Sequence, residues 1–276
     1  MQVTFWGVRG SIPTPGPDTV EFGGNTSCIE VRCGHHIIIL DAGTGIRLLG
    51  QKLVRELPIE AHLFFSHVHW DHIQGFPFFA PAFIPGNVIN LFGGSNFSHT
   101  LEETLAGQMD YPSFPVHLAE MGARMNFRDL REGEVHEIGG GEVRVSNTRG
   151  NHPNGVYAYR IDHEGKSVVY ATDTEHYSIV DPKLKKLCQG VDLLIYDAMY
   201  TPEEYSGQVG GMAKTGWGHS TYVDAVELAR AAGARRLVLH HHDPTQSDAA
   251  VRDKERRCRE LFPESLAGRE GLTLEV

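Results

Sequence analysis

The stretch SHVHWDHIQG, from Ser66 to Gly75, contains three histidines and an aspartate within six consecutive positions. It directly follows an apolar run, AHLFF at 61–65, that has the composition of a buried strand. Imidazoles and carboxylates without thiolates are a donor set that suits Zn²⁺, Mn²⁺ or iron ions. A histidine-rich stretch can also be a solvated loop, so the interpretation depends on whether distant parts of the chain supply further ligands.

Three later positions also place a potential ligand shortly after an apolar, β-rich run. They are His152 in RGNHPNG, Asp173 in YATDTEH and His241 in LVLHHHDP. If these strands are parallel neighbours, their carboxyl ends meet at one edge and the side chains converge there. Two metal ions about 3.5 to 4 Å apart, bridged by a carboxylate and a hydroxide, need about seven ligands. The chain offers seven candidates: His67, His69, Asp71, His72, His152, Asp173 and His241.

The β-rich runs form two groups, one before Ser66 and one after residue 131, and each group is accompanied by an amphipathic helix. The helices are expected at 45–57 and at 220–233, the second capped by Ser220 or Thr221 and ended by Gly233. This order predicts two sheets packed face to face with helices outside. Residues 76–131 are rich in Pro, Phe and Gly and are predicted to be an inserted, lid-like segment within a single domain spanning 1–276.

Composition narrows the classes of function. The chain has 276 residues and a formal net charge of −10, which argues against a broad nucleic-acid-binding surface and makes nucleic acid an improbable partner. No apolar run reaches the roughly 18 residues of a membrane span, and the N-terminus lacks a signal-peptide pattern. The four cysteines form no CxxC pair, so we expect free thiols and a cytoplasmic location.

Several motifs resemble a known family. SHVHWDH matches the HxHxDH signature of the metallo-β-lactamase superfamily, and LDAGTG at 40–45 resembles its first motif. GHSTYVDAVELARAAGARRLVLHHHDP at 218–244 resembles the phosphodiesterase branch, which includes tRNase Z, phosphoribosyl cyclic phosphodiesterases and cyclic-nucleotide phosphodiesterases. The resemblance covers nearly the whole chain except 76–131. It implies an α/β fold, the αββα sandwich of two packed mixed β-sheets with helices on the outer faces.

The resemblance also implies how the ligands are shared. His67, His69 and His152 would hold one divalent ion, Asp71, His72 and His241 would hold the second, and Asp173 would bridge them. The ions would be Zn²⁺ in the first place and Mn²⁺ in the second. His240 and His242 are alternatives to His241 as the last ligand. Asp41 would support the metal loop by hydrogen bonding, although it could instead cap the helix that follows it.

In such a site a metal-bridged hydroxide attacks a phosphodiester, and the departing alkoxide needs a proton. The resemblance assigns the general acid to His219 in WGHST, and Glu175 is expected to hydrogen-bond that imidazole. Asp71 would be both a ligand and the partner of the attacking water. Asn25 in GGN would present backbone N–H groups to the phosphate, unless this glycine-rich stretch is only a connector.

We therefore expect a binuclear phosphodiesterase acting on a small cyclic phosphodiester, with a 3′,5′-cyclic nucleotide as the leading candidate. A tRNase Z-like RNA 3′-processing endonuclease, a thioester or lactone hydrolase, and a non-catalytic metal protein are the alternatives. Tyr111 and Phe114 are candidates for stacking on a base, although they could equally form the core of the lid or a subunit contact. The related phosphodiesterases lead us to expect a homodimer.

Overall fold

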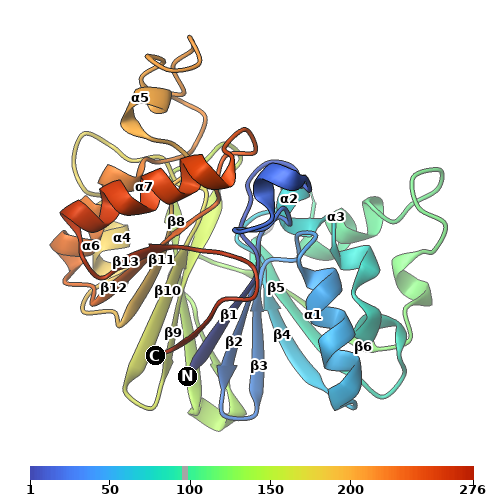
Figure 1. Cartoon of the computed structure of the whole chain (residues 1–276). Helices are drawn as coiled ribbons and strands as arrows, with labels where there is room; N and C mark the ends of the chain where they lie inside the picture. Colours follow the sequence, from blue (N-terminus) through green and yellow to red (C-terminus); the bar gives the residue numbers. More distant parts are fainter. Residues whose placement is uncertain (95–98) are drawn as a thin grey trace.

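The computed structural model describes residues 1–94 and 99–276, whose strands form two seven-stranded mixed sheets packed face to face (Figure 1). The first sheet has the order β14-β1-β2-β3-β4-β5-β6. Its strands are β1 (Gln2–Gly7), β2 (Cys28–Cys33), β3 (His36–Leu40), β4 (Glu60–Phe64), β5 (Val88–Gly94), β6 (Arg124–Leu130) and β14 (Thr273–Glu275). Strands β3 to β6 are parallel, so their carboxyl ends lie at one edge.

The second sheet has the order β13-β12-β11-β10-β9-β8-β7. Its strands are β7 (Val135–Ile138), β8 (Val143–Gly150), β9 (Val156–His163), β10 (Lys166–Ala171), β11 (Leu193–Asp197), β12 (Arg236–His240) and β13 (Ser265–Ala267). Strands β10 to β13 are parallel, and β9 is antiparallel to both β8 and β10. Strands β8, β10, β11 and β12 therefore run in the same direction and end at the same edge.

Helices cover the outer faces of the two sheets (Figure 1). On the first sheet these are α1 (Ile46–Leu53) and α3 (Leu101–Gly107), and on the second α4 (Pro182–Leu187), α6 (Tyr222–Ala232) and α7 (Asp248–Leu261). Two short helices, α2 (Trp70–Ile73) and α5 (Pro202–Tyr205), lie in the loops beyond the strand ends. The αββα sandwich expected from the sequence is confirmed.

Three apolar layers hold this arrangement together. The central layer joins the inner faces of the sheets and includes Phe5, Leu40, Phe64, Tyr159 and Ile195, all fully buried. The other two layers lie between each sheet and its helices. Strands buried on both faces have continuous apolar sequences rather than alternating ones, as LLIYD in β11 illustrates.

Local signals end the elements as the sequence predicts. Thr221 caps α6 by accepting hydrogen bonds from the backbone N–H groups of Val223 and Asp224, and Gly233 ends the helix with φ = 68°. All four cysteines are buried and free. Within the described ranges, no helix combines the length and the apolar character needed to cross a membrane.

The predicted lid at 76–131 needs correction. This segment contributes β5 and β6 to the first sheet, in parallel register with β4. Its helix α3 packs on the same sheet, with Leu101 and Leu105 buried in the layer beneath. The sequence concealed the second of these strands, because β6 is an edge strand with mostly polar, exposed residues, RMNFRDL, which lack the apolar signal of a core strand.

Candidate metal centre

The candidate ligands lie beyond the carboxyl ends of strands at one edge of the sandwich. Strand β4 leads to His67 and helix α2, β8 leads to His152, β10 leads to Asp173, and β12 leads to His241. Because these strands come from both sheets and end at the same side, their loops meet across the interface between the sheets. The structure thus brings all seven candidates into two adjoining groups.

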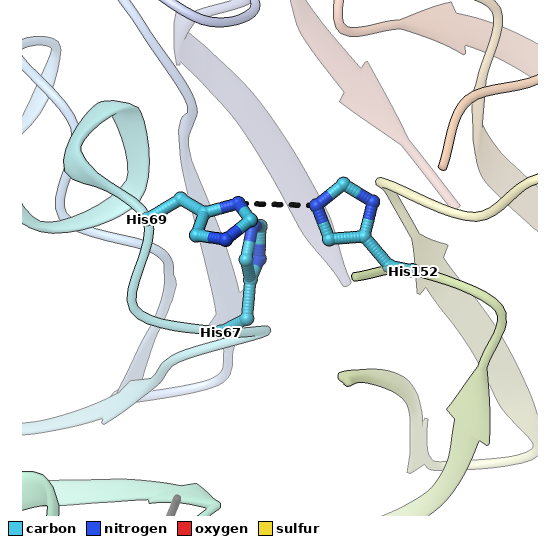
Figure 2. Close-up of side chains that lie close together, drawn as sticks. All are labelled: His67, His69 and His152. Carbon is cyan, nitrogen blue, oxygen red and sulfur yellow. Dashed lines mark hydrogen bonds between the residues drawn. The ribbon is translucent and has the colours of Figure 1, made fainter. Parts of the chain in front are cut away.

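The first group consists of His67, His69 and His152, whose ligand nitrogens lie within 4.8 Å of one another. Figure 2 shows the three imidazoles pointing toward one another, with His152 approaching from the opposite side. The Nε2 atom of His152 lies 3.1 Å from Nδ1 of His69. The buried Nε2 of His67 has no hydrogen-bond partner among the described residues, which is costly unless a ligand binds there.

The second group consists of Asp71, His72, Asp173 and His241. Asp71 Oδ2 lies 3.0 Å from Nε2 of His241 and 3.2 Å from Nε2 of His72. Asp173 faces both groups, since its Oδ2 lies 3.2 Å from Nε2 of His72 and its Oδ1 lies 3.7 Å from Nε2 of His67. Asp173 therefore lies between the two groups, where its carboxylate could contact a metal ion held by either of them.

The protonation states of four of the candidates suit divalent cations, whereas the carboxylates of Asp71, Asp173 and Asp41 outweigh burial and raise the pKa of His72, so this imidazole must lose a proton to bind a metal ion. Burial alone would raise the pKa of Asp71, but His72 and His241 hold it well below its usual range, so the carboxylate stays ionised. Asp173 is likewise buried, and the surrounding histidines hold its pKa low. Burial lowers the pKa of His67 and of His152, which keeps these imidazoles neutral and able to bind metal. The buried carboxylates and imidazoles, together with the His67 nitrogen that has no partner, therefore fit divalent cations.

The backbone is strained where it presents the ligands. Asp41, Asp173 and His241 have φ values of 62°, 51° and 61°, a region that residues other than glycine seldom adopt. The ring of His241 lies so close to Gly10 that a Cβ atom there would be 2.4 Å from it. The N-terminal loop therefore packs against the site, and Ser11 donates its backbone N–H to Asp71 Oδ2 at 2.7 Å. The sequence reasoning missed this contact of Ser11.

Among the three consecutive histidines, only His241 belongs to the ligand groups of the described chain. Its neighbours are bonded elsewhere, with Nε2 of His240 3.3 Å from Ser27 Oγ and Nε2 of His242 3.0 Å from the Gly268 carbonyl oxygen. The positive φ of His241 explains the difference, because it rotates this side chain away from the strand's normal alternation.

Asp41 supports the site from behind. Its Oδ2 lies 2.7 Å from Nδ1 of His72 and accepts from the Tyr170 hydroxyl at 2.6 Å. Its Oδ1 accepts from the backbone N–H of Ser66 at 2.7 Å. With Nδ1 of His72 bonded to a carboxylate, Nε2 is directed to the site. Asp41 is not the helix cap, since α1 begins after Gly45 and has no side-chain cap.

His219 lies beside both groups. Its ring stacks on His241 with centroids 4.9 Å apart, and its centroid lies 5.2 Å from that of His152. Nδ1 of His219 lies 2.8 Å from Asp197 Oδ2. Burial lowers the pKa of His219, but the carboxylates of Asp197, which contributes most, and of Asp173 and Asp71 outweigh this effect and raise it to about 9. His219 is therefore protonated at neutral pH.

The expected pairing of Glu175 with His219 is wrong. Glu175 accepts hydrogen bonds from the hydroxyl of Tyr205 and from the backbone N–H groups of Gly216 and Gly218. Asp197 takes the place beside His219 because it ends β11, the strand next to β12. An acidic residue directly after an apolar strand, VDLLIYD, was the available signal, and it matches that of Asp173.

The three substrate-binding candidates have other contacts. The side chain of Asn25 donates to Glu270 at 2.9 Å, and its backbone N–H donates to the same carboxylate at 2.6 Å. Phe114 packs edge-to-face on Phe78 with centroids 5.6 Å apart. Tyr111 is 83% exposed. These contacts favour the alternative interpretations, a structured connector for Asn25 and local packing for Phe114.

Comparisons with known proteins agree with this geometry. The family described as beta-lactamase superfamily domain matches residues 36–242, which contain all seven candidate ligands. A ribonuclease Z of Gemmatimonas aurantiaca is 26% identical over 318 residues, covering 99% of this chain and 95% of that protein.

Solved structures show the same fold. The metallo-β-lactamase fold protein YhfI of Bacillus subtilis has a TM-score of 0.73 at 18% identity, covering 100% of this chain and 98% of that one. The short form of human tRNase Z has a TM-score of 0.65 at 20% identity, covering 100% of this chain and 99% of that one. The family match, the fold and the two ligand groups lead to one conclusion: the chain belongs to the metallo-β-lactamase superfamily of hydrolases.

Proposed function

We propose that this protein is a metal-dependent phosphodiesterase that hydrolyses a small cyclic phosphodiester, with a 3′,5′-cyclic nucleotide as the leading substrate. The observation that carries the proposal is the His219–Asp197 pair beside the two ligand groups. Opening a phosphodiester releases an alkoxide, which is a poor leaving group unless it receives a proton. A thioester or lactone needs less help of this kind, because a thiolate or carboxylate leaves more readily.

The residues divide the work as follows. When bound, two divalent cations would supply a nucleophile at neutral pH and stabilise negative charge on the phosphoryl group. One would be held by His67, His69 and His152, the other by Asp71, His72 and His241, and Asp173 would contact both. We expect Zn²⁺ first and Mn²⁺ second, because the donors are imidazoles and carboxylates.

His219 would donate its proton to the leaving oxygen, and Asp197 would keep that imidazole charged and fix its orientation. The Asp197 carboxylate is itself held in place, since its Oδ1 accepts from the backbone N–H groups of Met199 and Ser220 at 3.1 and 3.0 Å. Glu175 would act at one remove, by holding the loop that leads into His219.

A tRNase Z-like endonuclease is the second candidate, and the name of the Gemmatimonas relative favours it. The name of that relative does not support our expectation that nucleic acid is not a partner. The charge of this chain still favours a small substrate, with 35 acidic against 25 basic residues. The alignment with that relative spans 318 residues against 276 in this chain, so the relative has positions that this chain lacks.

The proposal is tested with metal-loaded protein and its His219→Ala variant. Each is incubated with 3′,5′-cyclic AMP and CMP, 2′,3′-cyclic nucleotides, a ribose 1,2-cyclic phosphate and a precursor tRNA, and the products are separated by chromatography. Opening of a cyclic phosphate that is lost in the variant is the expected result. Cleavage of the tRNA alone would replace the first candidate by the second. No activity with both metals bound would refute both and direct the search to thioesters and lactones.

A further inference from the structure

Two of the three tryptophans of the chain are exposed, and both are sequence neighbours of site residues. Trp70, between His69 and Asp71, is 80% exposed, and Trp217, two residues before His219, is 47% exposed. Indole side chains are usually well buried, so two exposed ones next to residues of the same site are candidates for a binding surface. The third, Trp6, is half-buried and donates to Glu30 at 3.1 Å.

Each tryptophan adjoins a residue that contacts the first ligand group. His69, next to Trp70, lies 3.1 Å from one nitrogen of His152, and the other nitrogen of His152 lies 2.9 Å from the carbonyl oxygen of Gly218, next to Trp217. Figure 2 shows His69 and His152 facing each other from separate elements. The approach at Gly218 is close, since a Cβ atom there would lie 2.1 Å from His152 Nδ1. Trp70 and Trp217 are therefore the sequence neighbours of two residues, His69 and Gly218, that contact His152 from different elements.

Both positions are rigidly held. The backbone N–H groups on either side of Trp217, those of Gly216 and Gly218, donate to the same Glu175 carboxylate at 2.8 and 2.9 Å. Trp70 is the first residue of α2, and the three helical residues after it are buried, so its side chain alone points outward from this helix. A backbone held in this way reduces the conformational entropy that must be lost when an aromatic side chain stacks on a flat ring.

Lys214 adds a positive charge to this rim. Its Nζ lies 4.3 Å from the centroid of the Trp217 ring, a cation–π contact that occupies one face of the indole. In a chain with a net charge of −10, a lysine here offers an anionic substrate a local attraction. A planar ring attached to a phosphate is the ligand that matches two indoles, a lysine and a metal centre.

We propose that Trp70 and Trp217 form an aromatic rim that stacks on the base of a nucleotide, which makes the substrate a nucleotide rather than a base-free sugar phosphate. This inference rests on the proposed function, because it assigns the phosphate to the same metal centre. Stacking of one base on an aromatic side chain strengthens binding by about 5- to 150-fold. Loss of either indole is therefore expected to weaken nucleotide binding by a factor in this range.

The test compares matched ligands with and without a base. Calorimetry measures the Kd of AMP and of ribose 5-phosphate for metal-loaded wild-type protein and for Trp70→Ala, Trp217→Ala and Trp70→Phe. We expect the alanine variants to lose AMP affinity while ribose 5-phosphate binding stays within about 2-fold, and Trp70→Phe to recover most of the affinity. Trp6→Phe, which leaves only the two rim indoles to fluoresce, should retain quenching by AMP.

Hydrolysis separates this inference from the proposed function. On 3′,5′-cyclic AMP the alanine variants should raise KM more than they lower kcat, with little effect on a ribose cyclic phosphate. Tryptophan-dependent AMP binding without hydrolysis of any phosphodiester would overturn the function but not the rim. Active enzyme whose AMP affinity is unchanged in both alanine variants would overturn the rim. The rim is also overturned if Trp70→Ala binds AMP normally but dissociates a dimer in sedimentation velocity, because Trp70 is then a subunit contact.

Discussion

Replacing Asp197 by asparagine tests how His219 is kept ready to donate a proton. The substitution preserves the shape of the side chain, and the backbone N–H groups of Met199 and Ser220, which donate to Oδ1, keep an oxygen facing them. The new NH₂ group then faces Nδ1 of His219, where a carboxylate oxygen lies at 2.8 Å in the native protein. An NH₂ group only donates, so it favours the neutral imidazole with Nδ1 unprotonated.

The expected magnitude follows from the pKa of His219, which is about 9 because the nearby carboxylates, above all Asp197, outweigh the opposing effect of burial. Without the carboxylate, the pKa should fall to roughly 6.5, the value of an ordinary histidine, or lower. At pH 7.5 the protonated fraction then drops from nearly complete to about one tenth, so kcat should fall about 10-fold. Removing the imidazole itself, in His219→Ala, should cost about 100- to 10,000-fold.

The assay uses two leaving groups and a pH series. The protonated form is the active one, so activity is lost as the pH rises through the pKa, and this alkaline limb should move to lower pH in Asp197→Asn. A cyclic nucleotide has an alkoxide leaving group and should show the full loss. Bis(4-nitrophenyl) phosphate has a leaving group that needs no proton and should be hydrolysed almost as fast as by the wild type. Equal losses on both substrates, or an alkaline limb that does not move, would refute the role of the pair.

Three further predictions concern stability and metal content. Lys254 is fully buried and donates to the carbonyl oxygens of Ala198 and Met199 and to Gln246 Oε1. Lys254→Met should therefore lower the free energy of unfolding, measured in urea, by about 2 to 3 kcal/mol. A change below about 0.5 kcal/mol would contradict the importance of these bonds. His152→Ala should bind one divalent ion where the wild type binds two, as measured by elemental analysis, and an unchanged ratio would contradict the assignment of the first ligand group. Because the ligands converge only in the folded chain, each ion present at 100 times its Kd should stabilise the fold by about 2.7 kcal/mol. A chelator should therefore lower Tm by several degrees. The shift should be smaller in His152→Ala, and an equal shift in both proteins would count against two ions.

The fold was predictable where a strand is both apolar and interior. Runs such as HIIIL in β3 and LLIYD in β11 have the continuous apolar character of strands buried on both faces, and α6, which packs beside β11, carries its own N-cap and C-cap. The segment 76–131 was not predictable in the same way. Strand β6 at the sheet edge is polar and gains its place by pairing with β5, a contact between distant residues that leaves no local pattern.

The sequence by itself determined which atoms are available to bind metal. The histidines and aspartate at 67–72 lie within one short stretch, and His152, Asp173 and His241 each follow a strand whose apolar character is evident from the letters alone. Spacing and strand ends suffice for this because both are local properties of the chain. They do not reveal which strand lies next to which.

Only the tertiary structure decided the partner of His219 and the placement of the two tryptophans. Asp197 is the last residue of β11 and Glu175 lies shortly after β10, and the choice between these two acidic residues depends on the order of the second sheet. Strand β11 lies between β10 and β12, and Asp197 is in register with His240, so the Asp197 carboxylate reaches the site from within the sheet. Glu175 instead lies beyond β10 and accepts hydrogen bonds from the loop that carries Trp217. Contacts between strand ends are set by strand order and register, which arise when the two sheets pack.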